Sequence, residues 1–201
     1  MAEVGIDLIK KLRDISGAGL GACKEALSIT GGNMDEAMKY LREKGLAKSI
    51  KRQSNVAENG YISVYRHSDR LIVVLQLACE TDFAARSEVF KKFADDLALH
   101  VAAAAPQYKD VDSIPDEVLK QLKNEFYEGL EEKPKEVAEK IVEGKLSKFY
   151  SENVLTEQRF FLDESKTVKD AINELVARLG EKVEISYFYK FDVKNGIYFS
   201  P

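Results

Sequence analysis

The residues best suited to contact another molecule form the short motif Glu80-Thr81-Asp82-Phe83. An apolar run at 71–77 precedes the motif and a helical pattern follows it, so we expect an exposed loop at the exit of a buried strand. Two interpretations are open. In one, Phe83 folds back as a hydrophobic staple and Asp82 caps the following helix. In the other, Phe83 is an interface anchor and Asp82 faces the charges of a partner. The residue types alone favour the first.

A second motif, Gly17-Ala18-Gly19-Leu20-Gly21-Ala22, fits the G-x-G-x-x-A form of a dinucleotide fingerprint, and Asp35 lies near the distance expected of a ribose-binding acid. The fingerprint requires a buried strand before the glycines. Residues 6–15 instead have a charged, amphipathic helical pattern, so we interpret the glycines as a tight turn between two helices. A nucleotide enzyme that uses this turn is the weaker alternative.

Candidates for catalysis are few. His67 and Asp82 could form an acid–base pair at the ends of adjacent strands, but no Ser or Cys stands in a recognisable nucleophile elbow. We interpret Cys23, Cys79 and His100, which lie in apolar patterns, as core residues. With two cysteines, two histidines and no CxxC spacing, the sequence also argues against a zinc site and a disulfide framework. We therefore expect no enzyme, no metal and no cofactor.

The composition of the 201 residues excludes further classes. A net charge of −4 and a pI near 5.4 oppose a protein that coats nucleic acid, so no direct nucleic-acid partner is expected. The N-terminus lacks a signal-peptide pattern, and the apolar stretches are too short to cross a bilayer, which predicts a cytoplasmic protein without a membrane partner. The basic segment 48–52 and the polar stretch 53–59 that follows it are interpreted as a solvated linker between modules. The alternative is a ribosome- or RNA-associated interaction module that uses this segment.

The elements that would position these residues begin with three short helices in residues 1–52. The apolar residues Leu8, Ile9, Leu12 and Ile15 recur at helical spacing in the first. Asn33 is a suitable N-cap for the third helix, and Gly45 is expected to end it.

Residues 53–201 predict an α+β core. A hairpin with its turn at 67–69 leads into the strand 71–77, which is expected to be buried on both faces. Proline starts two helices of a helical hairpin at about 114–151. A final strand should place residues 183, 185, 187, 189 and 191 on one face, and Asn195-Gly196 should turn the chain back. The predicted fold is a three-helix module followed by a mostly antiparallel sheet covered by helices.

Two longer segments extend the motifs described above. The first is Leu12-Arg13-Asp14-Ile15-Ser16-Gly17-Ala18-Gly19-Leu20 with Cys23-Lys24-Glu25-Ala26-Leu27, and the second is Cys79-Glu80-Thr81-Asp82-Phe83. Both resemble signatures of the elongation factor Ts family. Tyr65-Arg66-His67 and the stretch from Lys133 to Lys145 are similar to the family as well. The match runs nearly from end to end and in the family's order.

The resemblance implies a guanine nucleotide exchange factor that acts in translation elongation on GDP-bound elongation factor Tu. It implies that Asp82, Phe83, Thr81 and His67 take part in nucleotide release. A ubiquitin-associated-like N-terminal module would bind the same partner through Lys10, Leu12, Arg13, Leu20 and Lys24. The core of this chain is as short as in the compact members of the family, which implies a homodimer formed through the apolar sheet.

Overall fold

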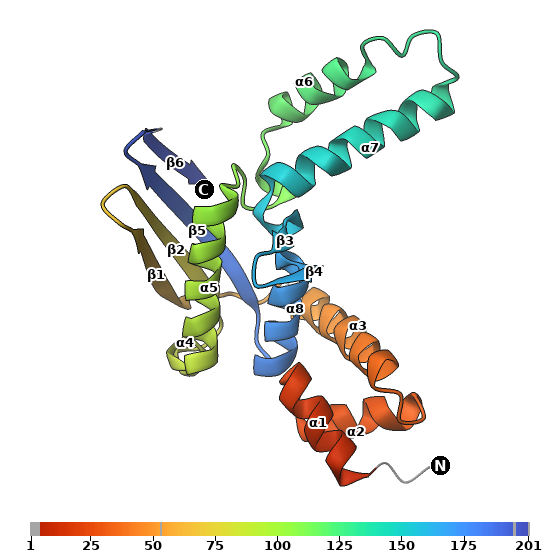
Figure 1. Cartoon of the computed structure of the whole chain (residues 1–201), viewed down its shortest axis with the longest axis vertical. Coiled ribbons are helices and arrows are strands. Elements are labelled where there is room, and N and C mark those ends of the chain that lie inside the picture. The colour runs from red at the N-terminus through yellow and green to blue at the C-terminus, as the bar shows by residue number, and fades with distance from the viewer. Residues whose placement is uncertain (1–4, 53, 195, 201) are drawn as a thin grey trace. The chain divides into compact units, whose positions relative to one another are not determined.

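The structure is a computed structural model that describes residues 5–52, 54–194 and 196–200, without the side chains of 48, 49 and 198–200. It has the predicted α+β class, with helices first and a sheet after them (Figure 1). The chain folds as two compact units. The first comprises Met1–Tyr61, Ala78–Phe90 and Asp170–Glu184, and the second comprises Ile62–Leu77, Lys91–Lys169 and Ile185–Pro201.

Three helices open the first unit: α1 (Ile6–Ser16), α2 (Leu20–Ile29) and α3 (Met34–Arg52). Gly17 ends α1 with φ 67°, a left-handed conformation that favours glycine, so the glycine-rich motif is a turn between helices as predicted. The Asn33 side chain caps α3 by accepting hydrogen bonds from the backbone N–H groups of Asp35 and Glu36, at 3.0 and 3.2 Å. The buried core of this module is Leu12, Ala18, Cys23, Ala26, Leu27, Ala37 and Leu41.

The prediction that Gly45 ends the third helix is wrong, because α3 continues to Arg52. Gly45 is instead a contact point with α8 (Val168–Leu179): a Cβ atom there would stand 3.1 Å from the Cβ of Ala177. The glycine is needed for close approach of two helices rather than for a left-handed turn. Residues 48–52 are therefore part of a helix, so the linker interpretation is wrong for them, whereas residues 54–58 form an irregular connection between α3 and the first strand.

A four-stranded sheet has the order β1-β2-β5-β6. Its strands are β1 (Asn59–His67), β2 (Leu71–Cys79), β5 (Val183–Asp192) and β6 (Gly196–Ser200). The predicted β1–β2 hairpin is confirmed, with Ser68 at φ 54° in its turn. β6 pairs antiparallel with β5 as the turn signal predicted; Gly196 has φ 84°, and Asn195 lies outside the described residues.

Strand β2 is buried on one face, not on both as predicted. Val73, Leu75 and Leu77 are buried, whereas Ile72 is exposed and Val74 is half-buried. The covered face of the sheet is the one against α5 (Glu88–Ala104), where the Ser63 hydroxyl donates a 2.6 Å hydrogen bond to Asp95 (Figure 1).

The alternation predicts one apolar face for residues 183, 185, 187, 189 and 191, but the buried positions of strand β5 change phase along its length. Ile185 is buried, but further along the strand Phe188 and Lys190 are the buried residues, and Tyr189 and Phe191 are exposed. Lys190 can lie inward because its ammonium group donates a 3.1 Å hydrogen bond to the carbonyl of Ala102, near the C-terminus of α5. A cation is favoured at that end of a helix.

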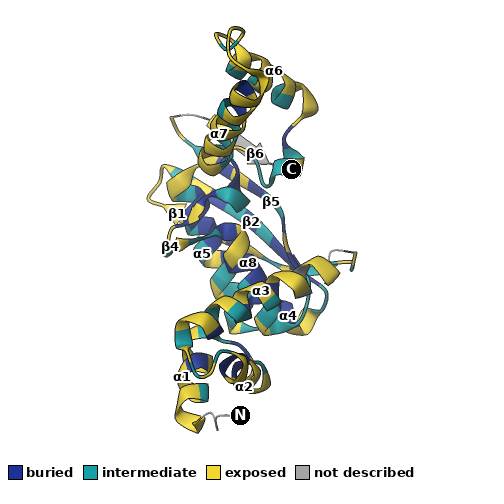
Figure 2. Ribbon diagram, turned by 90° about the vertical axis from the view of Figure 1, so that its right-hand side faces the viewer, coloured by how far each residue is buried: buried dark blue, intermediate teal, exposed yellow. Residues whose placement is uncertain are grey.

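The predicted helical hairpin is confirmed as α6 (Asp116–Tyr127) and α7 (Lys135–Asn153), which lie side by side and are largely exposed (Figures 1 and 2). Pro115 and Pro134 precede the two helices, as expected. Short 3-10 turns, Val111–Ser113 and Leu155–Glu157, flank the hairpin.

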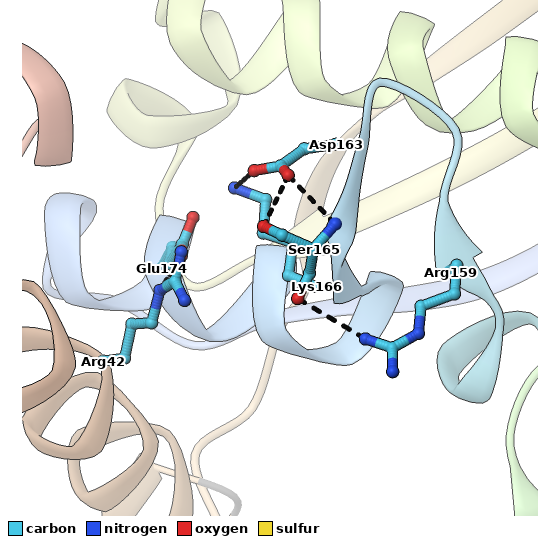
Figure 3. Close-up of polar contacts among 6 residues, drawn as sticks. All are labelled: Arg42, Arg159, Asp163, Ser165, Lys166 and Glu174. Carbon is cyan, nitrogen blue, oxygen red and sulfur yellow. Dashed lines mark hydrogen bonds and ion pairs between the residues drawn. The ribbon is translucent and has the colours of Figure 1, made fainter.

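The strands β3 (Arg159–Phe160) and β4 (Asp163–Thr167) follow the helical hairpin. Figure 3 shows Asp163, at the start of β4, accepting hydrogen bonds from the N–H and hydroxyl of Ser165 in the same strand at 3.2 and 2.6 Å.

The residues interpreted as core are buried. Cys23 and Cys79 are buried and free, and burial raises the pKa of the Cys79 thiol to about 11. The Nε2 atom of His100 lies 2.9 Å from the side-chain oxygen of Gln158, and Nδ1 accepts a 3.1 Å hydrogen bond from the N–H of Phe161. Because Nδ1 accepts, Nε2 carries the proton and the ring is neutral. This is a structural histidine.

Candidate partner-binding site

The Glu80-Thr81-Asp82-Phe83 motif forms the step from β2 into the short helix α4 (Asp82–Arg86). Thr81 is the N-cap: its hydroxyl oxygen accepts a 3.3 Å hydrogen bond from the N–H of Ala84. The interpretation in which Asp82 caps the helix is therefore wrong. Asp82 occupies the first turn of α4 and forms a 3.3 Å ion pair with Arg86, one turn further on.

Phe83 does not fold back onto its own chain. The residue is 83% exposed, the largest exposed fraction of any large hydrophobic residue that the structure describes. The residues on either side of it in sequence behave differently: Ala84 and Ala85 are buried and hold α4 in place. An aromatic ring held in water by a fixed backbone is the arrangement expected of an interface anchor.

The backbone beneath Phe83 is held by residues distant in sequence. Both carboxylate oxygens of Glu181 accept hydrogen bonds from Thr81, one from its hydroxyl at 2.6 Å and one from its N–H at 3.0 Å. The amide of Asn59 donates a 2.9 Å hydrogen bond to the carbonyl of Glu80. The Glu80 carboxylate accepts from Arg52 at 2.8 Å and from the N–H of Lys182 at 2.5 Å.

These contacts make Glu80 a structural carboxylate. The N–H group of Lys182 is the main cause that lowers the pKa of Glu80 below its ordinary value of 4.5. Sequence reasoning missed Glu181 and Asn59. Glu181 binds the backbone of Thr81 across 100 residues, and Asn59 binds the backbone of Glu80 across 21 residues. No local pattern reveals contacts at these separations. Sequence reasoning also missed the ion pair of Arg52, whose charge had been assigned to a solvated linker.

The N-terminal residues expected to bind a partner differ in accessibility. Lys10, Arg13 and Lys24 are exposed, and Leu20 is 50% exposed. Leu12 is fully buried in the core of the three helices, so it has no surface with which to contact a partner directly. The expectation of a contact is wrong for this residue, because the helical period of α1 turns it inward.

Several apolar residues of this module that sequence analysis did not assign to binding are exposed, among them Ile15 and Ile29. Ile15 was expected to face inward, yet it is exposed at the end of α1, and Ile29 is exposed at the end of α2. Together with Leu20 they place apolar side chains on the surface of a module that also carries exposed basic groups.

His67 belongs to the second unit, whereas Thr81, Asp82 and Phe83 belong to the first. The imidazole is exposed at the end of β1, where its Nδ1 lies 3.1 Å from the hydroxyl of Tyr65. The structure therefore does not gather His67 with the other three residues in one unit, and the acid–base pair with Asp82 gains no support.

Other kinds of site are not found in the described part of the chain. Residues 5–52, 54–194 and 196–200 contain no group of three or more His, Cys, Asp or Glu side chains placed to hold a metal ion. Within the same residues, no helix combines the length and the apolar character needed to cross a bilayer.

Comparison with known proteins agrees with the signatures. A family model described as Elongation factor TS matches residues 28–195. The chain is 44% identical over 200 residues to the elongation factor Ts of Desulfitobacterium hafniense, which covers 98% of this chain and 92% of that protein. It is 42% identical over 195 residues to the elongation factor Ts of Thermotoga petrophila, covering 96% of this chain and 98% of that protein. The chain therefore belongs to the elongation factor Ts family of translation elongation factors.

Proposed function

We propose that this chain is a guanine nucleotide exchange factor for elongation factor Tu, which promotes release of GDP. The observation that carries the proposal is the exposure of Phe83, a residue that is 83% exposed at the start of a fixed helix. Displacing a bound nucleotide requires no covalent step. It requires a contact that the partner makes better without GDP than with it.

Phe83 supplies the apolar part of that contact. Its ring enters a pocket between helices of the partner's nucleotide-binding domain and is desolvated there. Buried aromatic anchors contribute roughly 2–4 kcal/mol to protein interfaces. Because α4 is anchored by the buried Ala84 and Ala85, inserting the ring does not require the helix to form during binding.

Asp82 supplies the charge. It precedes Phe83 directly, its side chain is half-exposed, and it forms an ion pair with Arg86. A carboxylate brought near the Mg²⁺ ion that holds GDP competes for the ion's environment, and loss of the cation leaves the negative diphosphate poorly balanced. His67 acts near the phosphate-binding loop in this proposal. Lys10, Arg13, Leu20 and Lys24 bind the same domain of the partner.

Binding of GDP and binding of the exchange factor to the partner are thermodynamically linked. A factor that weakens GDP binding is itself bound more weakly when GDP is present, by the same ratio. An acceleration of ~10⁴-fold corresponds to about 5.5 kcal/mol. One buried aromatic anchor and the loss of Mg²⁺ coordination together are of this size.

We further propose that a second copy of the chain covers the face of the sheet that α5 leaves open, so that the factor acts as a homodimer. On that face of the second unit, alternate residues of three strands are apolar and at least partly exposed. They are Ile62, Val64, Ile72, Val74, Tyr187, Tyr189 and Phe191. A continuous apolar surface of this kind is typical of a site covered by another protein.

The test uses elongation factor Tu loaded with a fluorescent GDP analogue. Adding the chain should release the analogue, and Phe83→Ala should slow the stimulated release at least tenfold without changing the unfolding midpoint. Phe161→Ala is the matched control, because Phe161 is also an exposed phenylalanine (53%) but lies in the turn between β3 and β4. Equal release by the parent chain and Phe83→Ala would refute the role of Phe83, and no release by the parent chain would refute the function.

A further inference from the structure

At the base of α4, each of two glutamates accepts a hydrogen bond from the residue that follows the other glutamate in sequence. The carboxylate of Glu80 accepts the backbone N–H of Lys182, and the carboxylate of Glu181 accepts the backbone N–H of Thr81. Residues 80–81 and 181–182 are thus joined reciprocally, although a hundred residues separate them. All four residues belong to the first unit.

Glu181 makes the more specific of these contacts. Its two carboxylate oxygens lie 2.6 Å from the hydroxyl oxygen and 3.0 Å from the backbone nitrogen of Thr81. Thr81 is left with no free donor, because the N–H and the hydroxyl proton both point to the same carboxylate. Hydrogen bonds to an ionised group are roughly twice as strong as neutral ones.

The orientation of the Thr81 hydroxyl matters for the helix that follows. While its proton is donated to Glu181, its oxygen accepts the N–H of Ala84 and so caps α4. One side chain therefore fixes the cap, and the cap fixes the backbone from which Phe83 projects. The Thr81 carbonyl is also engaged, since it accepts hydrogen bonds from the thiol of Cys79 and the N–H of Ala85.

The same contacts tie α4 to the ends of α8 and α3. Glu181 follows α8 directly, after Gly180 has ended that helix with φ 74°. Arg52, the last residue of α3, donates to Glu80. Helices α3 and α8 are themselves joined by the 3.1 Å ion pair of Arg42 with Glu174 (Figure 3).

We propose that Glu181 is a positioning residue for nucleotide exchange: by holding the N–H and hydroxyl of Thr81, it keeps Phe83 exposed in the orientation that meets the partner. The proposal rests on the exchange function proposed above. Without Glu181, the segment 80–83 samples other conformations, and only a fraction of molecules presents the ring correctly. The observed activity falls with that fraction.

The experiment is a double-mutant cycle in the fluorescent-GDP release assay, with Glu181→Ala, Phe83→Ala and the double variant. Glu181→Ala should lower the maximal release rate about tenfold while leaving the half-saturating concentration of the chain within twofold, because the N-terminal module is unchanged. In the Phe83→Ala background, Glu181→Ala should cause no further loss. Glu164→Ala, which removes an exposed carboxylate from β4, is the control and should behave like the parent chain.

Glu181→Gln provides the conservative variant. Its amide oxygen can still accept the N–H of Thr81 while its NH₂ group donates to the hydroxyl, so it should retain at least a third of the parent rate. Hydrogen exchange should show faster exchange at residues 80–85 in Glu181→Ala and unchanged protection in α1 and α2. If Glu181→Ala does not fold, Glu181→Gln replaces it in the cycle. The proposal is then supported if Glu181→Gln lowers the release rate of the parent chain but causes no further loss in the Phe83→Ala background.

The outcomes separate the two proposals. No release by the parent chain overturns the proposed function, and a normal rate for Phe83→Ala overturns the role of Phe83 and with it the positioning role of Glu181. A slow Phe83→Ala with a normal Glu181→Ala overturns only the positioning role. Losses that multiply in the double variant also overturn it, because Glu181 would then act by a route that does not involve Phe83.

Discussion

Gly45 of α3 lies against Ala177 of α8 so closely that a Cβ atom on Gly45 would stand 3.1 Å from the Ala177 Cβ and 3.2 Å from the carbonyl oxygen of Asn173. The glycine sits within a helix of 19 residues, where propensity alone would favour alanine by roughly 1 kcal/mol. Close packing of the two helices outweighs that preference.

We therefore expect Gly45→Ala to lower the free energy of unfolding by about 1–3 kcal/mol, because the backbone oxygen of Asn173 cannot move aside without distorting α8. Gly144 is the matched control: it also lies within a 19-residue helix, α7, and a Cβ there would meet nothing within 4 Å. Gly144→Ala should raise helix stability by about 0.5–1 kcal/mol. Urea unfolding followed by circular dichroism measures both, and a stabilising Gly45→Ala would contradict the packing argument.

Leu12 and Leu20 are a second pair of residues to compare: we expect alanine to lower stability at Leu12 and to weaken partner binding at Leu20. Leu12→Ala should cost about 2–5 kcal/mol of module stability, since it leaves a cavity in a fully buried core. Leu20, which is 50% exposed, should change stability by less than about 0.5 kcal/mol when replaced by alanine, yet weaken binding to elongation factor Tu. Denaturation measures the first effect and titration calorimetry with the partner the second. Normal partner affinity for Leu20→Ala would remove this residue from the interface.

The elements with a strong local signal could be predicted from the sequence. Gly17 ends α1, Asn33 caps α3 and the prolines precede the helices of the hairpin, because each of these choices is decided within a few residues. Gly45 looked like a helix stop for the same reason. Its actual role depends on α8, more than a hundred residues away, and no local pattern carries that information.

The candidate site shows the same division. The motif at 80–83 could be located from its position after an apolar strand, but its residue types favoured an inward Phe83. Thr81 caps α4 through a local hydrogen bond with the N–H of Ala84, but Thr81 is itself held by Glu181, a contact across a hundred residues that no local pattern reveals. The prediction of one apolar face for β5 failed for a related reason. Lys190 reaches the end of α5 and can therefore lie inward.

Asp82 and Arg86 form an exposed ion pair, so breaking it should change stability by less than about 0.5 kcal/mol from either side. Their effects on exchange should differ. Asp82→Asn should slow GDP release severalfold, because it removes the carboxylate that we propose disturbs the partner's Mg²⁺. Arg86→Gln frees that carboxylate and should leave the rate equal or slightly higher.

Removing Mg²⁺ gives the decisive comparison for Asp82. With EDTA in excess, the cation that Asp82 acts on is already gone, and the release rates stimulated by the parent chain and by Asp82→Asn should converge. A deficit of Asp82→Asn that persists in EDTA would show that Asp82 contributes by another contact.

His100 predicts a pH-dependent stability. Burial lowers the pKa of this imidazole below its ordinary value of 6.5, and the hydrogen bond to Gln158 only partly opposes the shift. Between the lowered pKa and 6.5, the unfolded chain binds more protons than the folded chain, so stability falls as the pH falls through this window. The loss cannot exceed about 1.4 kcal/mol per pH unit for one group.

The structure explains why protonation is unfavourable and offers a control. A charged His100 would turn Nδ1 into a donor that faces the N–H of Phe161, and it would bury a cation. We expect His100→Asn to flatten the dependence of the unfolding free energy on pH between about 7 and 5, even though the variant is less stable overall. His67, the other histidine of the chain, is exposed, and His67→Asn should retain the slope of the parent chain. Two carboxylates with shifted pKa values act only at lower pH. Hydrogen bonds from the Lys182 N–H to Glu80 and from Ser165 to Asp163 lower the pKa values of these groups from 4.5 and 3.8, so their stabilising contribution is lost below this range. If His100→Asn kept the parent slope across this range, the buried imidazole would not be its source.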